Sequence, residues 1–459
     1  MVPRASRVAG LAAGTCVGQN PAARRMAVHM AARTRSPMIP LRIAIVGYGT
    51  AGQAAAVLLT RDGHDVTVFE RVADPGPVGA GFLLQPSGLQ VLWQMGLLGP
   101  VMAHGARVDR LFGDTPCGRA VMDMRYAGLE SRLYGVGLQR GALFSILDSA
   151  WTARGHALRA GCDIVEVDAE RGVLRDACGE THGAFDLVVV ADGSASRLRS
   201  GVAAPRVDRP YPWGALWCLL PAGSWPWANE LRQRYVAARK MVGLLPVGGR
   251  PGDPTRRLSF FWSLQANAFS DWEQGGLAAW LDELNALWPE AAEVFAAIAD
   301  PAQLARARYR DTTMRSWHRG RVVLVGDAAH AMSPQLGQGV NMALMGAQAL
   351  AGALRTAPKM EAALAAYQHE RRAHVWIYQL WSRWLTPLFQ SGYDTVAKVR
   401  DATFLPLGRV PGGRDQMLRV LTGTRRGLFG TLGLDEGFVD ALGSAAPLPE
   451  ANAAARARL

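Results

Sequence analysis

The sequence predicts an α/β protein, in which a parallel-sheet domain is interleaved with an antiparallel β-sheet and followed by a helical segment. Three observations lead to this prediction. Several short apolar runs end in glycine beside an acid, as buried strands do at a ligand. Longer strand-like runs separated by proline and glycine lie between them. From Met360 onward the pattern is helical.

The first apolar run belongs to a strand–helix–strand unit. Leu41–Val46 is typical of a buried strand, an alanine-rich helix follows to about Arg61, and Asp65–Phe69 is typical of a second strand. This order of elements is that of a Rossmann-like nucleotide-binding unit.

Three glycines and one acid carry the chemistry of this unit. Gly47 makes the tight turn, Gly49 lets backbone approach a pyrophosphate, and Gly52 lets helix and strand pack closely. The helix N-terminus offers N–H groups and partial positive charge to phosphates. Glu70 follows Gly52 by 18 residues and is placed to bind a ribose hydroxyl. The acid favours a free 2′-hydroxyl, and therefore NAD or FAD rather than NADP.

Two later strands also end in an acid beside glycine. One is followed by Asp192-Gly193, and the other, Arg321–Val325, by Gly326-Asp327. The second pair leads into PQLGQGVN (Pro334–Asn341) at the start of a helix. Backbone this exposed at the mouth of a helix indicates that a ligand packs against it.

Together these motifs resemble those of the class A FAD-dependent monooxygenases, the para-hydroxybenzoate hydroxylase-like family of aromatic hydroxylases. That family carries an early GxGxxG, a central DG motif and a late GD motif followed by PxxGxGxN, in the order found here. The segment LQRGALFSIL resembles the family's segment whose arginine, here Arg140, reaches the FAD. The resemblance covers roughly residues 41–380.

The resemblance implies FAD as the cofactor and a role for each motif. It implies that Asp327 hydrogen-bonds the ribityl chain and that a helix N-terminus approaches the flavin ring, where it would stabilise negative charge on the reduced flavin. The residues expected to position the ring are Pro334, Gly337 and Gly339, with no general base assigned. The residues expected to bind FAD are Gly47, Gly49, Gly52, Glu70, Arg71, Arg140, Asp192, Gly193, Gly326, Asp327, Gly337, Gln338, Gly339, Val340 and Asn341.

Between the motifs, three runs predict an antiparallel sheet: Trp213–Leu220, Lys240–Val247 and Arg257–Leu264. In the family such a sheet covers the flavin and forms the substrate pocket. Its many aromatic and few charged residues favour a flat, apolar, aromatic substrate. The candidates for the pocket are Trp217, Phe261 and Trp262.

These patterns divide the chain into five parts. We expect an FAD-binding domain from three segments, a substrate-binding sheet from two, and helices at the C-terminal side. Residues 1–37 are rich in arginine, free of acids and interrupted by glycine, and we expect a disordered extension or a mis-called start. The ranges are 41–107, 138–204 and 301–358 for FAD, 108–137 and 205–300 for the sheet, 359–446 for the helices, and 447–459 for a disordered tail.

No metal site is predicted. In HERRAH the histidines His369 and His374 are five residues apart, about 140° around a helix, so they cannot share a metal on one face. We expect a solvated helix face there and a structural role for His330. The five cysteines are unpaired in spacing, which fits a reducing cytoplasm without disulfides or zinc knuckles.

Charge and hydropathy exclude two other classes of protein. The net charge of +12 falls to +6 once the six arginines of residues 1–37 are removed, and the remaining basic residues are scattered. We therefore expect no nucleic-acid binding. No apolar run approaches the roughly 18–20 residues that cross a bilayer.

The resemblance thus predicts an FAD-dependent monooxygenase that hydroxylates or epoxidises an apolar aromatic or heteroaromatic molecule with O2 through a flavin C4a-hydroperoxide. No second GxGxxG follows, so NADPH or NADH is expected to visit transiently as reductant. Three alternatives remain open: a flavin-dependent halogenase, although its WxWxIP motif is missing; an alkene reductase; and a redox-inert flavin-binding partner protein. The sequence does not determine substrate identity or oligomeric state.

Overall fold

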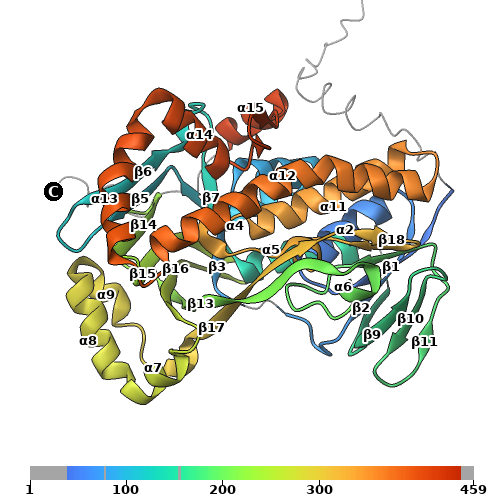
Figure 1. The fold of residues 1–459 in the computed structure, drawn as a ribbon, viewed down its shortest axis with the longest axis horizontal. Helices are drawn as coiled ribbons and strands as arrows, with labels where there is room; N and C mark the ends of the chain where they lie inside the picture. The colour runs from blue at the N-terminus through green and yellow to red at the C-terminus, as the bar shows by residue number, and fades with distance from the viewer. Residues whose placement is uncertain (1–38, 77–78, 154–156, 446–459) are drawn as a thin grey trace, which may run out of the picture.

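The computed structural model describes residues 39–76, 79–153 and 157–445 (Figure 1). The expectations for residues 1–37 and 447–459 lie outside the described residues. No helix in the described ranges combines the length and apolar character needed to cross a bilayer.

A six-stranded sheet is built from the short apolar runs of the sequence. Five neighbouring strands pair in parallel, and the edge strand β18 is antiparallel to its neighbour. Strands β12 and β19 are completely buried, as expected of a sheet covered on both faces. In sheet order the strands are β18 (His318–Arg319), β19 (Val322–Leu324), β12 (Leu187–Val190), β1 (Arg42–Val46), β2 (Asp65–Glu70) and β8 (Ala157–Ala160). The Rossmann-like part of the fold prediction is confirmed.

The carboxyl ends of four of these strands meet at one edge of the sheet. The N–H of Gly47 donates to the carbonyl of Phe69 at 2.8 Å. The N–H of Ala191 donates to Val46 at 2.8 Å, and that of Val325 to Val190 at 3.0 Å. The three motifs, far apart in sequence, are therefore adjacent in space.

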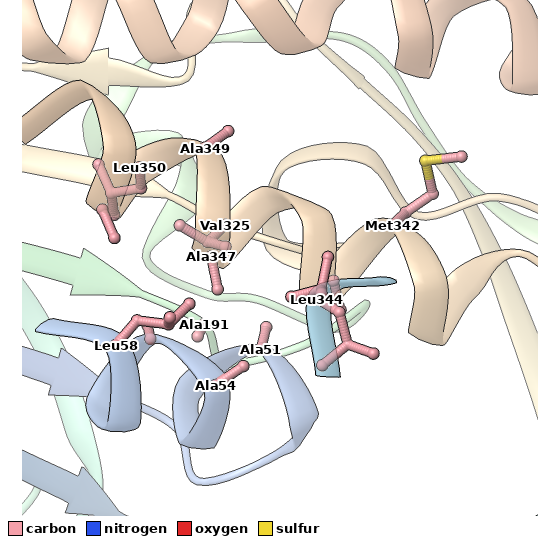
Figure 2. Packing of buried hydrophobic residues seen from close by; sticks show 14 of the residues in the cluster. Ala51, Ala54, Leu58, Ala191, Val325, Met342, Leu344, Ala347, Ala349 and Leu350 are labelled. Carbon is pink, nitrogen blue, oxygen red and sulfur yellow. The ribbon is translucent and has the colours of Figure 1, made fainter. Parts of the chain in front are cut away.

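Helices α2 (Thr50–Arg61) and α11 (Gly339–Thr356) pack against each other beside this edge. Both follow directly from a glycine motif, and both bury an apolar stripe in the same core as β1. Figure 2 shows alanine and leucine side chains at their contact, with Ala51, Ala54 and Leu58 of α2 facing Leu344, Ala347 and Leu350 of α11. Small residues allow the two helices to approach closely.

A seven-stranded sheet forms the second large layer. The three predicted runs lie in β13 (Pro205–Pro221), β15 (Lys240–Arg250) and β16 (Asp253–Gln265), which pair antiparallel. Residues 108–137, which we expected to join this sheet, contribute β5 (Arg110–Asp114) and β6 (Ala120–Arg125) to it. Strand β14 (Glu230–Val236) joins the two groups and is parallel to β5.

Two of the expected segment boundaries differ from the sheets. Strand β17 (Ala305–Met314) is the edge strand of the seven-stranded sheet, although range 301–358 was expected to belong to the FAD-binding part. Strand β7 (Gly135–Gln139) crosses the expected boundary at residue 138 and pairs with β3 (Gly81–Leu84) and β4 (Ala106–Val108). The polar sequence ARARYRDTT conceals β17 because every second residue is a charged side chain.

The two faces of the seven-stranded sheet are covered differently. Helices α7 (Phe269–Gly275), α8 (Leu277–Leu287) and α9 (Ala292–Phe295) pack on one face and enclose an aromatic core. The long helix α12 (Met360–Phe389) reaches part of the opposite face through Phe389.

The helical character of the C-terminal region is confirmed, with one small hairpin inserted. However, the prediction that HERRAH forms a solvated face is wrong for two of its six residues. Arg371 and His374 are 3% and 1% exposed, whereas His369 is exposed. The Nε2–H of His374 donates to the carbonyl of Gly423 at 2.9 Å, because the chain after α14 packs over this side of α12. The elements after α12 are α13 (Asp394–Arg409), α14 (Pro411–Leu421), β20 (Arg425–Arg426), β21 (Gly430–Thr431) and α15 (Glu436–Ser444).

A separate three-stranded meander follows β8 in the chain and lies at the lower right of Figure 1. It consists of β9 (Ile164–Asp168), β10 (Val173–Asp176) and β11 (Thr181–His182). The remaining helices are α3 (Pro86–Gln94), α4 (Leu98–His104), α5 (Arg140–Thr152), α6 (Arg199–Val202) and α10 (Asp327–His330).

Candidate cofactor and active site

Three motif glycines are packed tightly against backbone or side chains. A Cβ at Gly47 would lie 2.5 Å from the carbonyl oxygen of Ala191, and one at Gly326 would lie 2.9 Å from the Cβ of Ala51. A Cβ at Gly52 would overlap the carbonyl oxygen of Gly47. Gly47 and Gly326 also have φ of +102° and +64°, where glycine is favoured. These three glycines therefore serve the turns and the close packing of α2.

Four other motif glycines face open space. A Cβ added to Gly49, Gly193, Gly337 or Gly339 would meet no heavy atom within 4 Å. They follow or precede the elements that converge at the carboxyl edge of the sheet. The protein therefore leaves a line of bare backbone at this edge, which is what close approach of a nucleotide requires.

Two helix N-termini point their unused N–H groups at the same edge. The first intrahelical bond of α2 runs from Gln53 N to Gly49 O at 2.9 Å, and that of α11 from Met342 N to Gln338 O at 2.9 Å. Neither helix has a side-chain cap or an acid in its first turn. The N–H groups before those bonds can bind an anion, and both helix dipoles favour one.

The charged groups of Arg140 and Asp327 lie near each other at this edge. Both keep solvent-exposed surface although they are flanked by buried residues. Burial raises the pKa of Asp327 and lowers the pKa of Arg140, and attraction between the two charges opposes both shifts. Within the described ranges the Asp327 carboxylate has no hydrogen-bond or ion-pair partner.

Asp192 leaves a second polar group without a partner at this edge. Its Oδ1 is buried and accepts no hydrogen bond from the described residues, and burial raises its pKa. An orphaned buried oxygen needs a donor. The hydroxyl-rich ribityl or ribose parts of FAD supply such donors, so the residues present fit this cofactor.

Glu70 lies at the end of β2, as predicted. Its carboxylate accepts the N–H of Tyr48 at 2.8 Å and that of Val72 at 2.9 Å. These bonds fix its orientation, and a carboxylate keeps further lone pairs for a ligand. Arg71 is exposed beside it.

The PxxGxGxN segment divides into side chains that the protein uses and backbone that it leaves free. Asn341 is 0% exposed, its Oδ1 accepts from Gln85 N at 2.9 Å, and its amide donates to Leu83 O at 3.4 Å. Gln338 is buried and donates to Leu421 O at 2.8 Å. Their side chains therefore hold the loop in place, so any contact with a cofactor comes from their backbone. The half-buried Pro334 and Val340 complete the segment.

Arg199, to which no role was assigned from the sequence, anchors the DG turn. It is 2% exposed and donates to Thr312 Oγ1 at 2.6 Å and to the carbonyl of Gly193 at 3.1 Å. It thus joins the end of β12 to the seven-stranded sheet. The signal was its place seven residues after Asp192, within the DGSASRLR segment.

The face of the seven-stranded sheet toward Arg140 is aromatic. The rings of Trp217 and Phe261 lie 5.2 Å apart, and Trp217 Nε1 donates to the hydroxyl of Tyr309 at 2.9 Å. A Cβ at Gly243 would overlap the ring of Phe261, so this ring lies flat over the strand. Tyr309 lies close enough to Arg140 for the guanidinium charge to oppose the rise that burial causes in the pKa of Tyr309. Tyr309, which the sequence reading missed, thus joins Trp217 and Phe261 as a lining residue.

Trp262 lies on the opposite face. Successive residues of a strand alternate, and Trp262 packs against Trp280 of α8 at 5.8 Å in the core beneath the helices. The expectation that Trp262 lines the same pocket as Phe261 is wrong for this reason.

A separate cavity of about 440 Å³ lies behind the GD motif, between β17 and α12. His330 lines it, is 2% exposed, and packs against Trp317 with ring centroids 5.3 Å apart. Neither ring nitrogen has a partner among the described residues. Burial, together with Arg371, lowers the pKa of His330 to about 3, so the ring is neutral. His330 therefore contributes no charge to the cofactor site at the carboxyl edge of the sheet.

The chain is similar to known FAD-dependent hydroxylases. Residues 41–381 match the family model of the FAD binding domain. The chain is 29% identical over 357 residues to an FAD-dependent urate hydroxylase from Mycolicibacterium vanbaalenii, covering 72% of this chain and 84% of the relative. It is 30% identical over 361 residues to a kynurenine 3-monooxygenase from Salinispora arenicola, covering 72% and 76%.

A solved structure supports the fold. The Klebsiella pneumoniae protein HpxO, complexed with FAD and uric acid, superposes with a TM-score of 0.69 at 23% identity over 83% of this chain and 97% of that one. The motifs, the sheet edge and these similarities agree. The chain belongs to the FAD binding domain family of class A FAD-dependent monooxygenases.

Proposed function

We propose that this protein hydroxylates an apolar aromatic or heteroaromatic small molecule, with FAD as cofactor, NADPH or NADH as reductant and O2 as oxygen source. Family membership supports the cofactor and the type of reaction. One observation carries the substrate class: the flat aromatic face of Trp217, Phe261 and Tyr309 beside Arg140. The relatives named above act on urate and kynurenine.

The nucleotide end of FAD is assigned to the first motif. Gly49 and the N–H groups at the start of α2 bind the pyrophosphate, and Glu70 accepts from the ribose. Asp192, Gly193 and Arg140 flank the middle of the cofactor. No specific bond to FAD is assigned to the other residues of these motifs. The glycines shape the turns and Arg71 flanks one of them: Gly47, Gly52 and Gly326 are the glycines.

The flavin end is assigned to the late motif. FAD, when bound, supplies the redox chemistry and the activation of oxygen. Asp327 accepts from the ribityl hydroxyls, and Pro334, Gly337 and Gly339 set the position of the ring. The N–H groups at the start of α11 stabilise negative charge at the ring edge by ~1–2 kcal/mol.

The aromatic face binds and orients the substrate. Burial raises the pKa of Tyr309 to about 12, so its hydroxyl stays protonated. The oxygen already accepts from Trp217, which leaves the O–H free to donate to a polar atom of the substrate. The apolar walls exclude water and protect the reaction from competing hydrolysis. We assign no general base.

The other partners follow from the motif count and the fold. A second GxGxxG is missing from the sequence, so NAD(P)H binds only while it reduces the flavin. We place the protein in the cytoplasm, because its cysteines form no pairing pattern.

The test is turnover of the FAD-loaded enzyme with isotopically labelled O2 and a panel of phenols and heteroaromatics. We expect one labelled atom per product molecule and stimulated NAD(P)H oxidation. Gly339→Val should lower product formed per NAD(P)H, whereas Gly352→Val, on the same helix away from its N-terminus, should not. A reduced or chlorinated product without labelled oxygen, or label from water, would contradict the proposal.

A further inference from the structure

Outside the cofactor site, three potential metal ligands converge on the meander beside β2. Cys162 lies just before β9, Asp176 ends β10 and His182 ends β11. The Sγ of Cys162 lies 3.7 Å from Asp176 Oδ2 and 3.7 Å from His182 Nε2, and these two atoms are 2.9 Å apart. No step of the proposed reaction uses these side chains.

This spacing is close to that of a tetrahedral zinc site. With Zn–S of about 2.3 Å and Zn–N or Zn–O of about 2.0–2.1 Å, neighbouring ligand atoms lie roughly 3.3–3.6 Å apart. Two of the three observed separations are within about 0.2 Å of that range. The third separation, 2.9 Å between Asp176 Oδ2 and His182 Nε2, must increase by about 0.4 Å when their hydrogen bond is replaced by two bonds to the metal.

The surrounding structure already orients the ligands. Asp176 Oδ1 accepts the N–H of Cys178 at 3.0 Å and that of Glu180 at 2.9 Å, which turns Oδ2 toward the other two ligands. The side chains of Asp176 and His182 are each only 9% exposed. The ring of His182 packs on Phe69 of β2 at 5.1 Å. Such supporting contacts fix ligand orientation in metal sites.

We propose that Cys162, Asp176 and His182 bind one Zn²⁺, with water in the fourth position. Cys162 binds as the thiolate, and its proton leaves to solvent when the metal enters. His182 binds through Nε2 as the neutral ring. The ion links the three strands of the meander and holds them against the end of β2, where Cys162 N donates to the carbonyl of Glu70 at 2.9 Å.

The sequence did not indicate this site because its spacing forms no motif. The ligands are separated by 14 and 6 residues and come from three segments that only the meander brings together. The expectation of no metal site was based on HERRAH and on cysteine spacing alone.

The test is metal titration of the reduced, chelator-treated, FAD-loaded enzyme. Co²⁺ should give a thiolate-to-cobalt charge-transfer band and tetrahedral bands at longer wavelength than the flavin absorption. One equivalent of Zn²⁺ should displace it. Cys162→Ser should abolish the charge-transfer band and weaken Zn²⁺ binding at least tenfold, and His182→Gln should weaken it similarly. Cys117→Ser, an exposed cysteine beside Thr115 in the turn between β5 and β6, should change neither.

FAD content and circular dichroism of each variant show whether it is folded. If Cys162→Ser does not fold, alkylation of the wild-type enzyme replaces it: Zn²⁺ should slow labelling of Cys162 at least tenfold and leave Cys117 unaffected. A wild-type titration without a thiolate-to-cobalt band, or labelling of Cys162 that Zn²⁺ does not slow, would overturn the proposal. The cluster would then be a hydrogen-bonded triad only.

Discussion

The two large sheets meet the cofactor site in different ways. The six-stranded sheet presents the ends of its strands, so each contact is a turn that carries a glycine or an acid. The seven-stranded sheet presents a face, so its contacts are alternate side chains such as Trp217 and Phe261. In the first region backbone geometry makes the site, and in the second side-chain identity does.

This difference separates two kinds of specificity. A turn with no room for a Cβ tolerates one residue type, which suits a cofactor that never changes. A sheet face tolerates many side chains as long as the strand alternates. We therefore expect mutations at strand ends to affect folding or FAD, and mutations on the aromatic face to affect substrate.

The largest expected effect tests the end-on contacts. Gly52→Ala forces a Cβ onto the carbonyl of Gly47 and should destabilise the protein by on the order of 5 kcal/mol or more, with loss of soluble yield. Gly49→Ala, three residues earlier, meets open space and should keep the fold while weakening FAD binding. Urea unfolding and FAD titration measure the two effects. Equal stability of the two variants would remove the distinction between packed and open glycines.

The next effect tests the two faces of the seven-stranded sheet. Trp262→Ala removes a buried ring from the core under α8 and should cost about 3–5 kcal/mol of unfolding free energy, with KM for substrate unchanged. Trp217→Ala, on the half-buried opposite face, should cost less stability and raise KM. Steady-state kinetics alongside unfolding curves distinguish them. A change in KM for Trp262→Ala alone would reverse our assignment of the faces.

Cofactor affinity tests the acids at the strand ends. Asp327→Ala and Glu70→Ala should each weaken FAD by about 1.5–3 kcal/mol, or about ten- to hundredfold in Kd. Glu70→Ala should also lower the stability of the apoprotein, because the N–H groups of Tyr48 and Val72 lose their acceptor. Asp327→Ala should not, since its carboxylate has no partner among the described residues. Unchanged FAD affinity in both variants would contradict the assignment of these motifs.

A smaller effect concerns pH. The pKa of His330 is about 3 in the folded protein, whereas an unfolded histidine titrates near 6.5. The unfolded chain therefore binds the proton first, and stability is lost as pH falls below about 6.5. Between about pH 7.5 and about pH 5.5 the wild type should lose about 1.4 kcal/mol more than His330→Phe. Urea unfolding with excess FAD measures this, with His369→Phe as the exposed control. Parallel pH profiles for wild type and His330→Phe would show that His330 is not the source.

Removal of the residues before Met38 is expected to have no effect on FAD content or activity. A chain that starts at Met38 should keep full FAD content and activity, because every residue assigned to either sheet lies after it. Loss of folding on truncation would show that the preceding residues contribute to the core.

The strand ends of the six-stranded sheet were more predictable from the sequence than the face of the seven-stranded sheet. Gly47, Asp192 and Asp327 each follow a short apolar run, so the local pattern alone indicates a strand end and its chemistry. In the seven-stranded sheet, by contrast, the residues that face the site can be predicted only when the register of the strands is known. Phe261 and Trp262 are adjacent, so alternation already requires that only one faces the pocket, and the sequence reading overlooked this. Which of them does so depends on the helices that cover the other face.

Two other features of the structure could not be predicted from the local sequence pattern. Strand β17 does alternate, with Ala307 and Tyr309 on one face and arginines on the other, but its charge conceals a strand that lies at a sheet edge. The burial of His374 depends on the chain after α14, which packs over α12 from 49 residues downstream. Polar residues on a long helix give no local sign of such a cover.

The contact between α2 and α11 bears on how such enzymes diverge. Because the two helices pack directly through alanine and leucine side chains, this helix–helix contact sets the distance between the N-termini assigned to the pyrophosphate and the flavin (Figure 2). The long stretch of chain between the helices does not set it. Insertions, deletions and exchanges confined to the substrate-binding strands within that stretch can therefore occur while the distance between the two N-termini stays the same. Retention of the fold at 23% identity, with a TM-score of 0.69, is what this arrangement permits.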